Sequence, residues 1–221
     1  MPDWFADLWY EAVSWVSAAG ALLGFSARVE GGHHIPRRGP VLLLANHQCY
    51  LDPVFVGLAT RRRLCFLARK NLWRHKALGW LISSLNAFPV DQEGVAKEGL
   101  RTVLDLLGRG RAVLIFPEGQ RTWDGKMGPL KPGVHLLIKR ARPPIVPVGI
   151  AGAYDAWPRW RPYPLPAPLF PPVGRGTVAV SVGKPIDPGR FADLPREKVL
   201  TELFAEIHAL WQRAERLRRR G

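Results

Sequence analysis

Short apolar runs recur along the chain and alternate with amphipathic segments. Three runs are apolar at almost every consecutive position, which is typical of strands buried on both faces of a sheet. They are residues 41–45 (VLLLA), 112–116 (AVLIF) and 145–150 (IVPVGI). Shorter apolar runs predict three further strands, at residues 64–67, 87–90 and 178–182.

Helical periodicity appears between these runs. Residues 93–107 place Val95, Leu100 and Leu104 at helical spacing, and glycines follow directly at the expected helix end. Residues 133–142 and 195–217 predict two more helices. Strands separated by helices are typical of layered α/β domains. We therefore expect an α/β fold with a mostly parallel central sheet flanked by helices.

The first 27 residues differ from the rest of the chain. Asp3, Asp7 and Glu11 share one helical face, and residues 12–27 carry no charge. That uncharged run is shorter than the roughly 20 residues that span a bilayer, and no basic segment of a secretory signal precedes it. We expect one or two short amphipathic helices, lying on the bilayer or docked on the protein. The predicted organisation is a membrane-interacting segment, residues 1–27, followed by an α/β domain, residues 28–221.

Residues 155–175 contain seven prolines, which exclude a regular helix and indicate an extended surface excursion. This stretch carries Trp157 and Trp160, and the N-terminus carries Trp4, Trp9 and Trp15. Tryptophan favours membrane interfaces because its ring is apolar and its N–H donates a hydrogen bond. Both clusters are equally compatible with core packing.

The chain is strongly basic: 32 Lys and Arg against 18 Asp and Glu give a net charge of +14. Such an excess indicates a polyanionic neighbour, which can be nucleic acid, an anionic membrane, or phosphorylated substrates with an acidic carrier. The two cysteines, Cys49 and Cys65, form no CxxC pattern, so a reducing cytosolic setting is expected.

His47 and Asp52 follow the first buried strand. On a regular helix they would lie about 140° apart, so they can meet only if the backbone turns between them. Asp52-Pro53 begins a new apolar segment, and Asp is also a common N-cap, so capping alone explains its position. A His at the carboxyl end of a parallel strand lies where α/β folds bind ligands, and a nearby carboxylate would raise its basicity.

A second polar segment, Glu118-Gly119-Gln120-Arg121, follows the strand at 112–116 and should reach the same sheet edge. Gly119 would allow close backbone approach to a ligand, and the planar fork of Arg121 suits phosphate or carboxylate. The alternative is a surface turn with a weak Glu118–Arg121 ion pair.

Other catalytic and binding motifs are missing from the sequence. There is no GxSxG nucleophile elbow and no Walker loop. His33-His34 has no third ligand at metal-binding spacing, so we predict no metal site.

These segments together resemble the glycerolipid acyltransferase family. The stretch from Asn46 to Asp52 is similar to its HxxxxD block, and residues 116–122 (FPEGQRT) are similar to its FPEGTRS block. Residues 145–148 (IVPV) resemble the family's terminal proline-containing strand, and residues 131–133 (KPG) resemble the small motif before it. Residues 66–69 and 78–81 also fall in the expected order. HxxxxD alone is a weak signal, but ordered blocks from about residue 28 to 187 are specific.

The resemblance implies an acyltransferase of phospholipid biosynthesis, related to 1-acylglycerol-3-phosphate acyltransferase. His47 would be the general base and Asp52 would orient it. Glu118, Gly119, Arg121 and Arg69 would bind the acceptor. The acyl donor would be a thioester of coenzyme A or acyl carrier protein, with no other cofactor. The expected partners are a lysophospholipid and the lipid membrane, without nucleic acid, and the expected location is peripheral or shallowly inserted on the cytoplasmic side.

Two positions depart from the family pattern. Gln92 stands where an arginine is usual, and Gln120 stands where threonine is usual. Either Arg69, Lys70 or Arg121 compensates for the missing cation, or the acceptor is another lyso-lipid or an amino-lipid. A non-catalytic basic protein that binds membranes or nucleic acid is the alternative from a different class.

Overall fold

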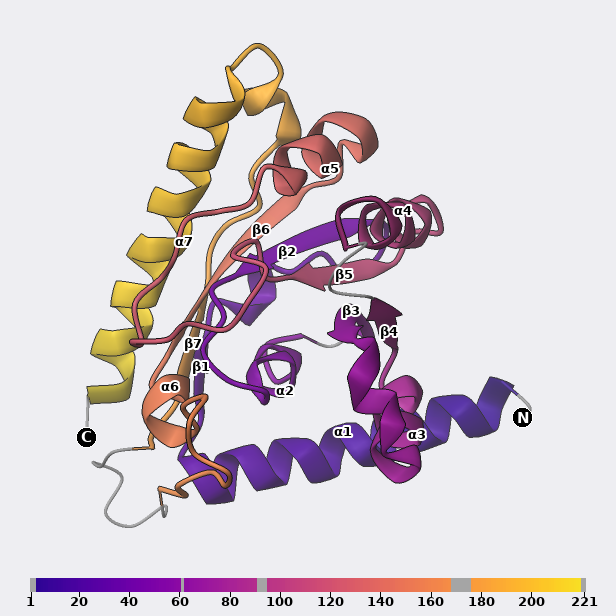
Figure 1. Cartoon of the computed structure of the whole chain (residues 1–221), viewed down its shortest axis with the longest axis vertical. Coiled ribbons are helices and arrows are strands. Elements are labelled where there is room, and N and C mark those ends of the chain that lie inside the picture. The colour runs from indigo at the N-terminus through magenta and orange to yellow at the C-terminus, as the bar shows by residue number, and fades with distance from the viewer. Residues whose placement is uncertain (1–2, 61, 91–94, 168–175, 220–221) are drawn as a thin grey trace.

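A twisted sheet runs through the molecule (Figure 1). The computed structural model describes residues 3–60, 62–90, 95–167 and 176–219, and within these the sheet has seven strands in the order β1-β7-β6-β2-β5-β3-β4. The strands are β1 (Arg28–Glu30), β2 (Val41–Ala45), β3 (Leu64–Arg69), β4 (Ala87–Val90), β5 (Ala112–Ile115), β6 (Ile145–Ala151) and β7 (Ala179–Val182).

The sheet is mostly parallel, as predicted. β6, β2, β5, β3 and β4 run in the same direction, whereas β7 is antiparallel to β6 and β1 is parallel to β7. All six predicted strands are present, with ends that differ by at most two residues. The three-residue strand β1 was not predicted, because it is too short to show a pattern.

Helices cover both faces of the sheet (Figure 1). They are α1 (Asp3–Phe25), α2 (Asp52–Gly57), α3 (Lys76–Ser84), α4 (Val95–Gly108), α5 (Gly133–Ala141), α6 (Ala153–Ala156) and α7 (Arg196–Arg219). Short 3-10 helices occur at Gly32–His34, Lys70–Arg74 and Pro188–Phe191. The predicted helices at 133–142 and 195–217 are confirmed, and the described part of the third, from residue 95, is helical as predicted.

The central strand β2 is completely buried. Leu42 and Leu44 pack into a core with α4, α5 and α7, whereas Val41, Leu43 and Ala45 pack into a second core with α2 and the end of α1. Because both faces of β2 are covered, its sequence shows an unbroken apolar run instead of an alternating pattern.

The N-terminal segment forms one helix of 23 residues, so the expectation of one or two short helices is corrected. The sequence contains no proline that would divide it, and Gly20 and Gly24 are tolerated within it. The inner face docks on the protein through Ala21, which is buried, and through Tyr10, whose hydroxyl oxygen accepts a hydrogen bond from Leu64 N at 3.3 Å. No helix in the described residues is long and apolar enough to cross a bilayer.

The proline-rich stretch lacks regular structure from residue 157 to 167, as expected, although its first two residues belong to α6. Hydrogen bonds anchor its end to the protein more firmly than is expected for an extended surface segment. Ala167 is buried, its N–H donates to Gly24 O at 2.7 Å, and its carbonyl accepts from Ser26 Oγ at 3.3 Å. The stretch therefore packs against the end of α1; residues 168–175 lie outside the described part.

Gly149 on β6 allows α7 to cross the sheet closely. A methyl group at this position would lie 2.1 Å from the Leu210 carbonyl carbon and from Trp211 N, both of which are helix backbone. Helix α7 could not accommodate that group without moving away from β6.

We expect Gly149→Ala to lower the free energy of unfolding by about 3 kcal/mol or more, because it forces backbone apart in a packed core. Gly108→Ala is the matched control, since nothing lies within 4 Å of that position. Urea unfolding curves of both variants would test this, and equal midpoints would contradict it.

Candidate active site

The loop after β2 begins with a side chain that joins two strands. Asn46 is buried, its Nδ2 donates to Ile150 O at 2.9 Å, and its Oδ1 accepts from Ile150 N at 2.7 Å. This pair of bonds imitates strand pairing beyond the end of β2. The backbone of the next residue, His47, is thereby fixed against β6.

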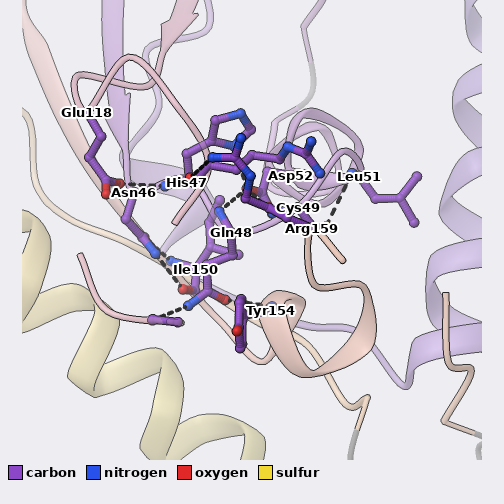
Figure 2. Close-up of polar contacts among 12 residues, drawn as sticks. Asn46, His47, Gln48, Cys49, Leu51, Asp52, Glu118, Ile150, Tyr154 and Arg159 are labelled. Atoms are coloured by element: carbon purple, nitrogen blue, oxygen red, sulfur yellow. Dashed lines mark hydrogen bonds and ion pairs between the residues drawn. The ribbon is translucent and has the colours of Figure 1, made fainter. Parts of the chain in front are cut away.

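Asp52 is fully buried, and its carboxylate hydrogen-bonds to several groups of the loop that precedes it (Figure 2). Its Oδ2 lies 2.8 Å from His47 Nδ1 and accepts from the backbone N–H groups of Gln48 at 2.5 Å and Cys49 at 2.9 Å. Leu51 is the N-cap of α2, and Asp52 is the first helical residue. Asp52 is therefore not the N-cap of α2: its carboxylate turns back to the preceding loop and to the imidazole.

His47 is held from three further directions. Its N–H donates to Glu118 Oε1 at 2.8 Å, and its carbonyl accepts from Thr122 N at 2.9 Å. Its ring stacks on Phe116, with centroids 3.9 Å apart and planes at 12°. Because every one of these partners follows β5, which pairs with β2, the two polar segments meet at one sheet edge as expected.

The hydrogen bonds define which imidazole nitrogen is available. Asp52 is an acceptor, so Nδ1 of His47 carries the hydrogen, and a neutral ring then has its lone pair on Nε2. No described residue hydrogen-bonds to Nε2, and the side chain is 19% exposed. Nε2 of His47 can therefore accept a proton from a hydroxyl group that lies within hydrogen-bonding distance of it.

Cys49 is a thiol beside the imidazole, but it is not a nucleophile in this structure. The residue is 1% exposed and its Sγ lies 3.4 Å from Asp52 Oδ1. Burial, and then the Asp52 charge, raise the pKa of the Cys49 thiol well above its ordinary value. A thiol that stays protonated and covered is inert.

Glu118 is buried, not part of a surface turn. Its Oε1 accepts from His47 N, and its Oε2 accepts from Gly128 N at 2.7 Å. Burial raises the pKa of Glu118 to about 7, opposed by its two backbone hydrogen bonds and increased by the Asp52 charge. The carboxylate contacts backbone and makes no ion pair with Arg121 among the described residues.

Arg121 extends across the loop between His47 and Asp52. Its guanidinium carbon lies 3.5 Å from the centroid of the Tyr50 ring. Burial lowers the pKa of the Arg121 guanidinium, and the charges of Arg159 and Arg69 lower it further. Gly119, the residue expected to let a ligand approach, has φ +73°, which favours glycine.

Three contacts around the candidate site were missed by sequence reasoning. Asn46 positions the loop, Gln48 bridges it to Tyr154 N at 3.2 Å, and Arg159 joins the group of polar residues around His47 (Figure 2). The partners of these residues are distant in the chain, so no local pattern could have indicated them. Gln92 lies outside the described residues, and Gln120 is exposed.

Two hollows lie at the opposite ends of the parallel strands, away from His47. One of about 460 Å³ is lined by residues such as Cys65 and Arg111, and one of about 320 Å³ by residues such as His33 and Arg62. Both are at the amino ends of the parallel strands and contain none of the residues around His47. Among the described residues no group of three His, Cys, Asp or Glu could hold a metal ion.

The sequence profile of the acyltransferase family matches residues 26–151, more than half of the chain. The chain belongs to the acyltransferase family. It is therefore an enzyme, and the alternative of a non-catalytic basic protein is set aside. The match includes both segments that meet at His47, whereas Arg159 lies beyond it.

Curated relatives agree with this acyltransferase assignment, and a solved structure agrees with the fold. The chain is 27% identical over 191 residues to 1-acyl-sn-glycerol-3-phosphate acyltransferase of Bacillus subtilis, covering 86% of this chain and 87% of that one. It is 29% identical over 148 residues to the enzyme of that name from Streptococcus pneumoniae, covering 66% and 50%. The crystal structure of the 1-acyl-sn-glycerophosphate acyltransferase from Thermotoga maritima has the same fold, with a TM-score of 0.79 and 23% sequence identity. The superposition covers 100% of this chain and 84% of that one.

The raised pKa of Glu118 should make the stability of this acyltransferase depend on pH. Between the ordinary value and about 7, the folded protein retains a proton that the unfolded chain has released. The free energy of unfolding should therefore fall as pH rises through this range, by up to roughly 3 kcal/mol.

Urea unfolding between pH 4.5 and 8 would measure this slope in the wild type and in Glu118→Gln, which cannot titrate at this position. We expect the variant to lose most of the decrease, even though it also loses one hydrogen-bond acceptor at every pH. Identical slopes in the two proteins would disprove the assignment to Glu118.

Proposed function

We propose that this acyltransferase moves a fatty acyl group from a thioester of coenzyme A or acyl carrier protein to the hydroxyl of lysophosphatidate. The observation that carries the proposal is the imidazole of His47, whose Nδ1 is bound by buried Asp52 and whose Nε2 has no partner among the described residues. The similarity to 1-acyl-sn-glycerol-3-phosphate acyltransferases supports the choice of acceptor.

In the proposed reaction, His47 Nε2 removes the proton from the acceptor hydroxyl as its oxygen attacks the thioester carbonyl carbon. The C–S bond then breaks, and the imidazolium returns the proton to the leaving thiolate. Asp52 stabilises the imidazolium by charge and fixes its ring through Nδ1. A proton transfer of this kind contributes about 10²–10⁴-fold in rate.

The other predicted site residues have different roles in this proposal. Arg121 and Arg69 bind the acceptor phosphate, because arginine matches phosphate oxygens with a planar fork. Glu118 positions His47 through its backbone N–H, since both carboxyl oxygens are already occupied. Gly119 shapes the turn between Glu118 and Arg121.

Gln92 is the reason to consider an alternative acceptor. An arginine is usual at that position in the family, so a lyso-lipid or amino-lipid with a different headgroup is the second candidate. The half-buried cations near His47 favour an acceptor that bears phosphate, because such an acceptor supplies the opposite charge.

We also propose that α1 rests on the membrane through its outer face. Leu8, Trp15 and Leu22 are seven residues apart and form one exposed stripe, with Val16 and Leu23 beside it. Helix α3 lies next to α1 (Figure 1) and adds exposed apolar side chains, among them Trp80 at 55% exposure. A monomer rarely exposes so many large apolar residues together without a partner surface.

We expect the wild type to convert lysophosphatidate and an acyl thioester into phosphatidate, and His47→Ala to lose about 10²-fold or more of kcat. Mass spectrometry of products from a mixed pool of lyso-lipids would identify the acceptor, and release of the free thiol would give the rate.

His33→Ala is the matched control, because that exposed histidine follows β1 at the opposite sheet edge. It should retain wild-type activity. Substantial transfer by His47→Ala would contradict the role of the imidazole, and preferential acylation of an acceptor without phosphate would favour the second candidate.

The membrane proposal predicts the behaviour of charge substitutions on α1. Trp15→Glu with Leu23→Glu should reduce binding to anionic phospholipid vesicles by about tenfold or more, because two apolar side chains no longer enter the interface. Leu136→Glu on α5, also an exposed leucine, should bind like the wild type. Vesicle flotation measures the bound fraction, and unchanged flotation of the double variant would contradict a membrane face on α1.

A further inference from the structure

Arg159 lies in the loop that follows α6, beyond the residues matched by the family profile. Its guanidinium carbon lies 3.6 Å from the centroid of the Trp123 ring. Its Nη1 donates to the Arg121 carbonyl at 2.9 Å. Arg159 is therefore fixed against the segment that supports His47.

The loop that carries Arg159 is itself tied to the site. Tyr154 N donates to Gln48 Oε1, and the Tyr154 hydroxyl donates to Trp123 O at 2.8 Å. Pro158 is buried, and its carbonyl accepts from Arg161 N at 3.1 Å in a tight turn. The loop that carries Arg159 is therefore joined to the His47 loop through Gln48 and to the segment after β5 through Trp123.

The carboxylates of these loops are all occupied by other groups. Asp52 binds His47, Glu118 binds backbone, Asp124 accepts from Thr122 Oγ1 and Lys126 N, and Asp155 binds Arg218 at 2.8 Å. Consequently no carboxylate of the described residues contacts the guanidinium of Arg121 or of Arg159.

Two half-buried guanidinium groups thus lie near each other without an opposite charge. Aromatic rings beneath them, Tyr50 and Trp123, fix their orientation and attract the cations. Burial is the main cause that lowers the pKa of the Arg121 guanidinium, and the charge of Arg159 lowers it further. An anionic ligand with several oxygens would relieve the repulsion between the two guanidinium groups.

We propose that Arg159 binds the acceptor phosphate together with Arg121 and supplies the cation that Gln92 does not. The inference rests on the proposed function, since it concerns the acceptor of that reaction. It assigns the compensation to a residue in the proline-rich loop, beyond residues 26–151 that the family profile matches. The stacked guanidinium of Arg159 would present its remaining N–H groups to the phosphate oxygens.

The test measures KM and kcat of purified full-length enzyme with lysophosphatidate as acceptor. Arg159→Ala should raise the KM for lysophosphatidate about 10- to 30-fold, which corresponds to the loss of one charge-assisted hydrogen-bonded contact. The kcat should change less than about threefold, because Nε2 of His47 is untouched. The KM for the thioester donor should remain that of the wild type.

Two further variants separate phosphate binding from a structural role. Arg159→Lys should recover part of the acceptor affinity, because it keeps the charge but loses the planar fork. Arg161→Ala, two residues away, should leave both KM values unchanged. If Arg159→Lys is as impaired as Arg159→Ala, or if both substrates lose affinity equally, Arg159 acts on structure and the inference fails.

The outcome for the wild type distinguishes this inference from the proposed function. A wild type that does not acylate lysophosphatidate contradicts the proposed function, and the inference falls with it. A wild type that acylates lysophosphatidate, with Arg159→Ala showing the same acceptor KM, contradicts the inference alone.

Discussion

The buried carboxylate of Asp52 is the interaction on which this edge of the sheet depends. An ionised group without exposure to water costs several kcal/mol unless other groups compensate for it. The loop between β2 and α2 provides that compensation with two backbone N–H groups, a thiol and an imidazole. The loop is therefore shaped around a charge, and the orientation of His47 follows from the same contacts.

Hydrogen bonds also fix the His47 loop to the neighbouring strands β5 and β6. His47 N–H and carbonyl are both bound by the segment after β5, and Asn46 is bound by Ile150 on β6. Because β2 lies between these two strands, both neighbours contribute to one loop. The imidazole is consequently placed by three parallel strands, which gives it far less freedom than a side chain on an isolated loop would have.

The sequence predicts the parts of this structure that depend on short-range pattern. Unbroken apolar runs indicate strands covered on both faces, and polar residues at their carboxyl ends indicate the functional edge. What it misses depends on partners far away in the chain. The buried state of Glu118 follows from contacts with His47 and Gly128, and the placement of Arg159 depends on Trp123. The length of α1 is set by the absence of a helix-breaking residue, not by its polarity pattern.

The distribution of charge separates two tasks around His47. Carboxylates point inward, where Asp52 and Glu118 organise backbone, whereas the guanidinium groups of Arg121 and Arg159 lie on aromatic rings at the rim. A basic site of this kind does not depend on the net charge of +14 of the whole chain. It depends on nearby carboxylates being occupied by partners other than the guanidinium groups. On the proposed function, the phosphate of a lysophospholipid would complete this rim, and the apolar stripe of α1 would keep the enzyme at the surface from which such a lipid must come.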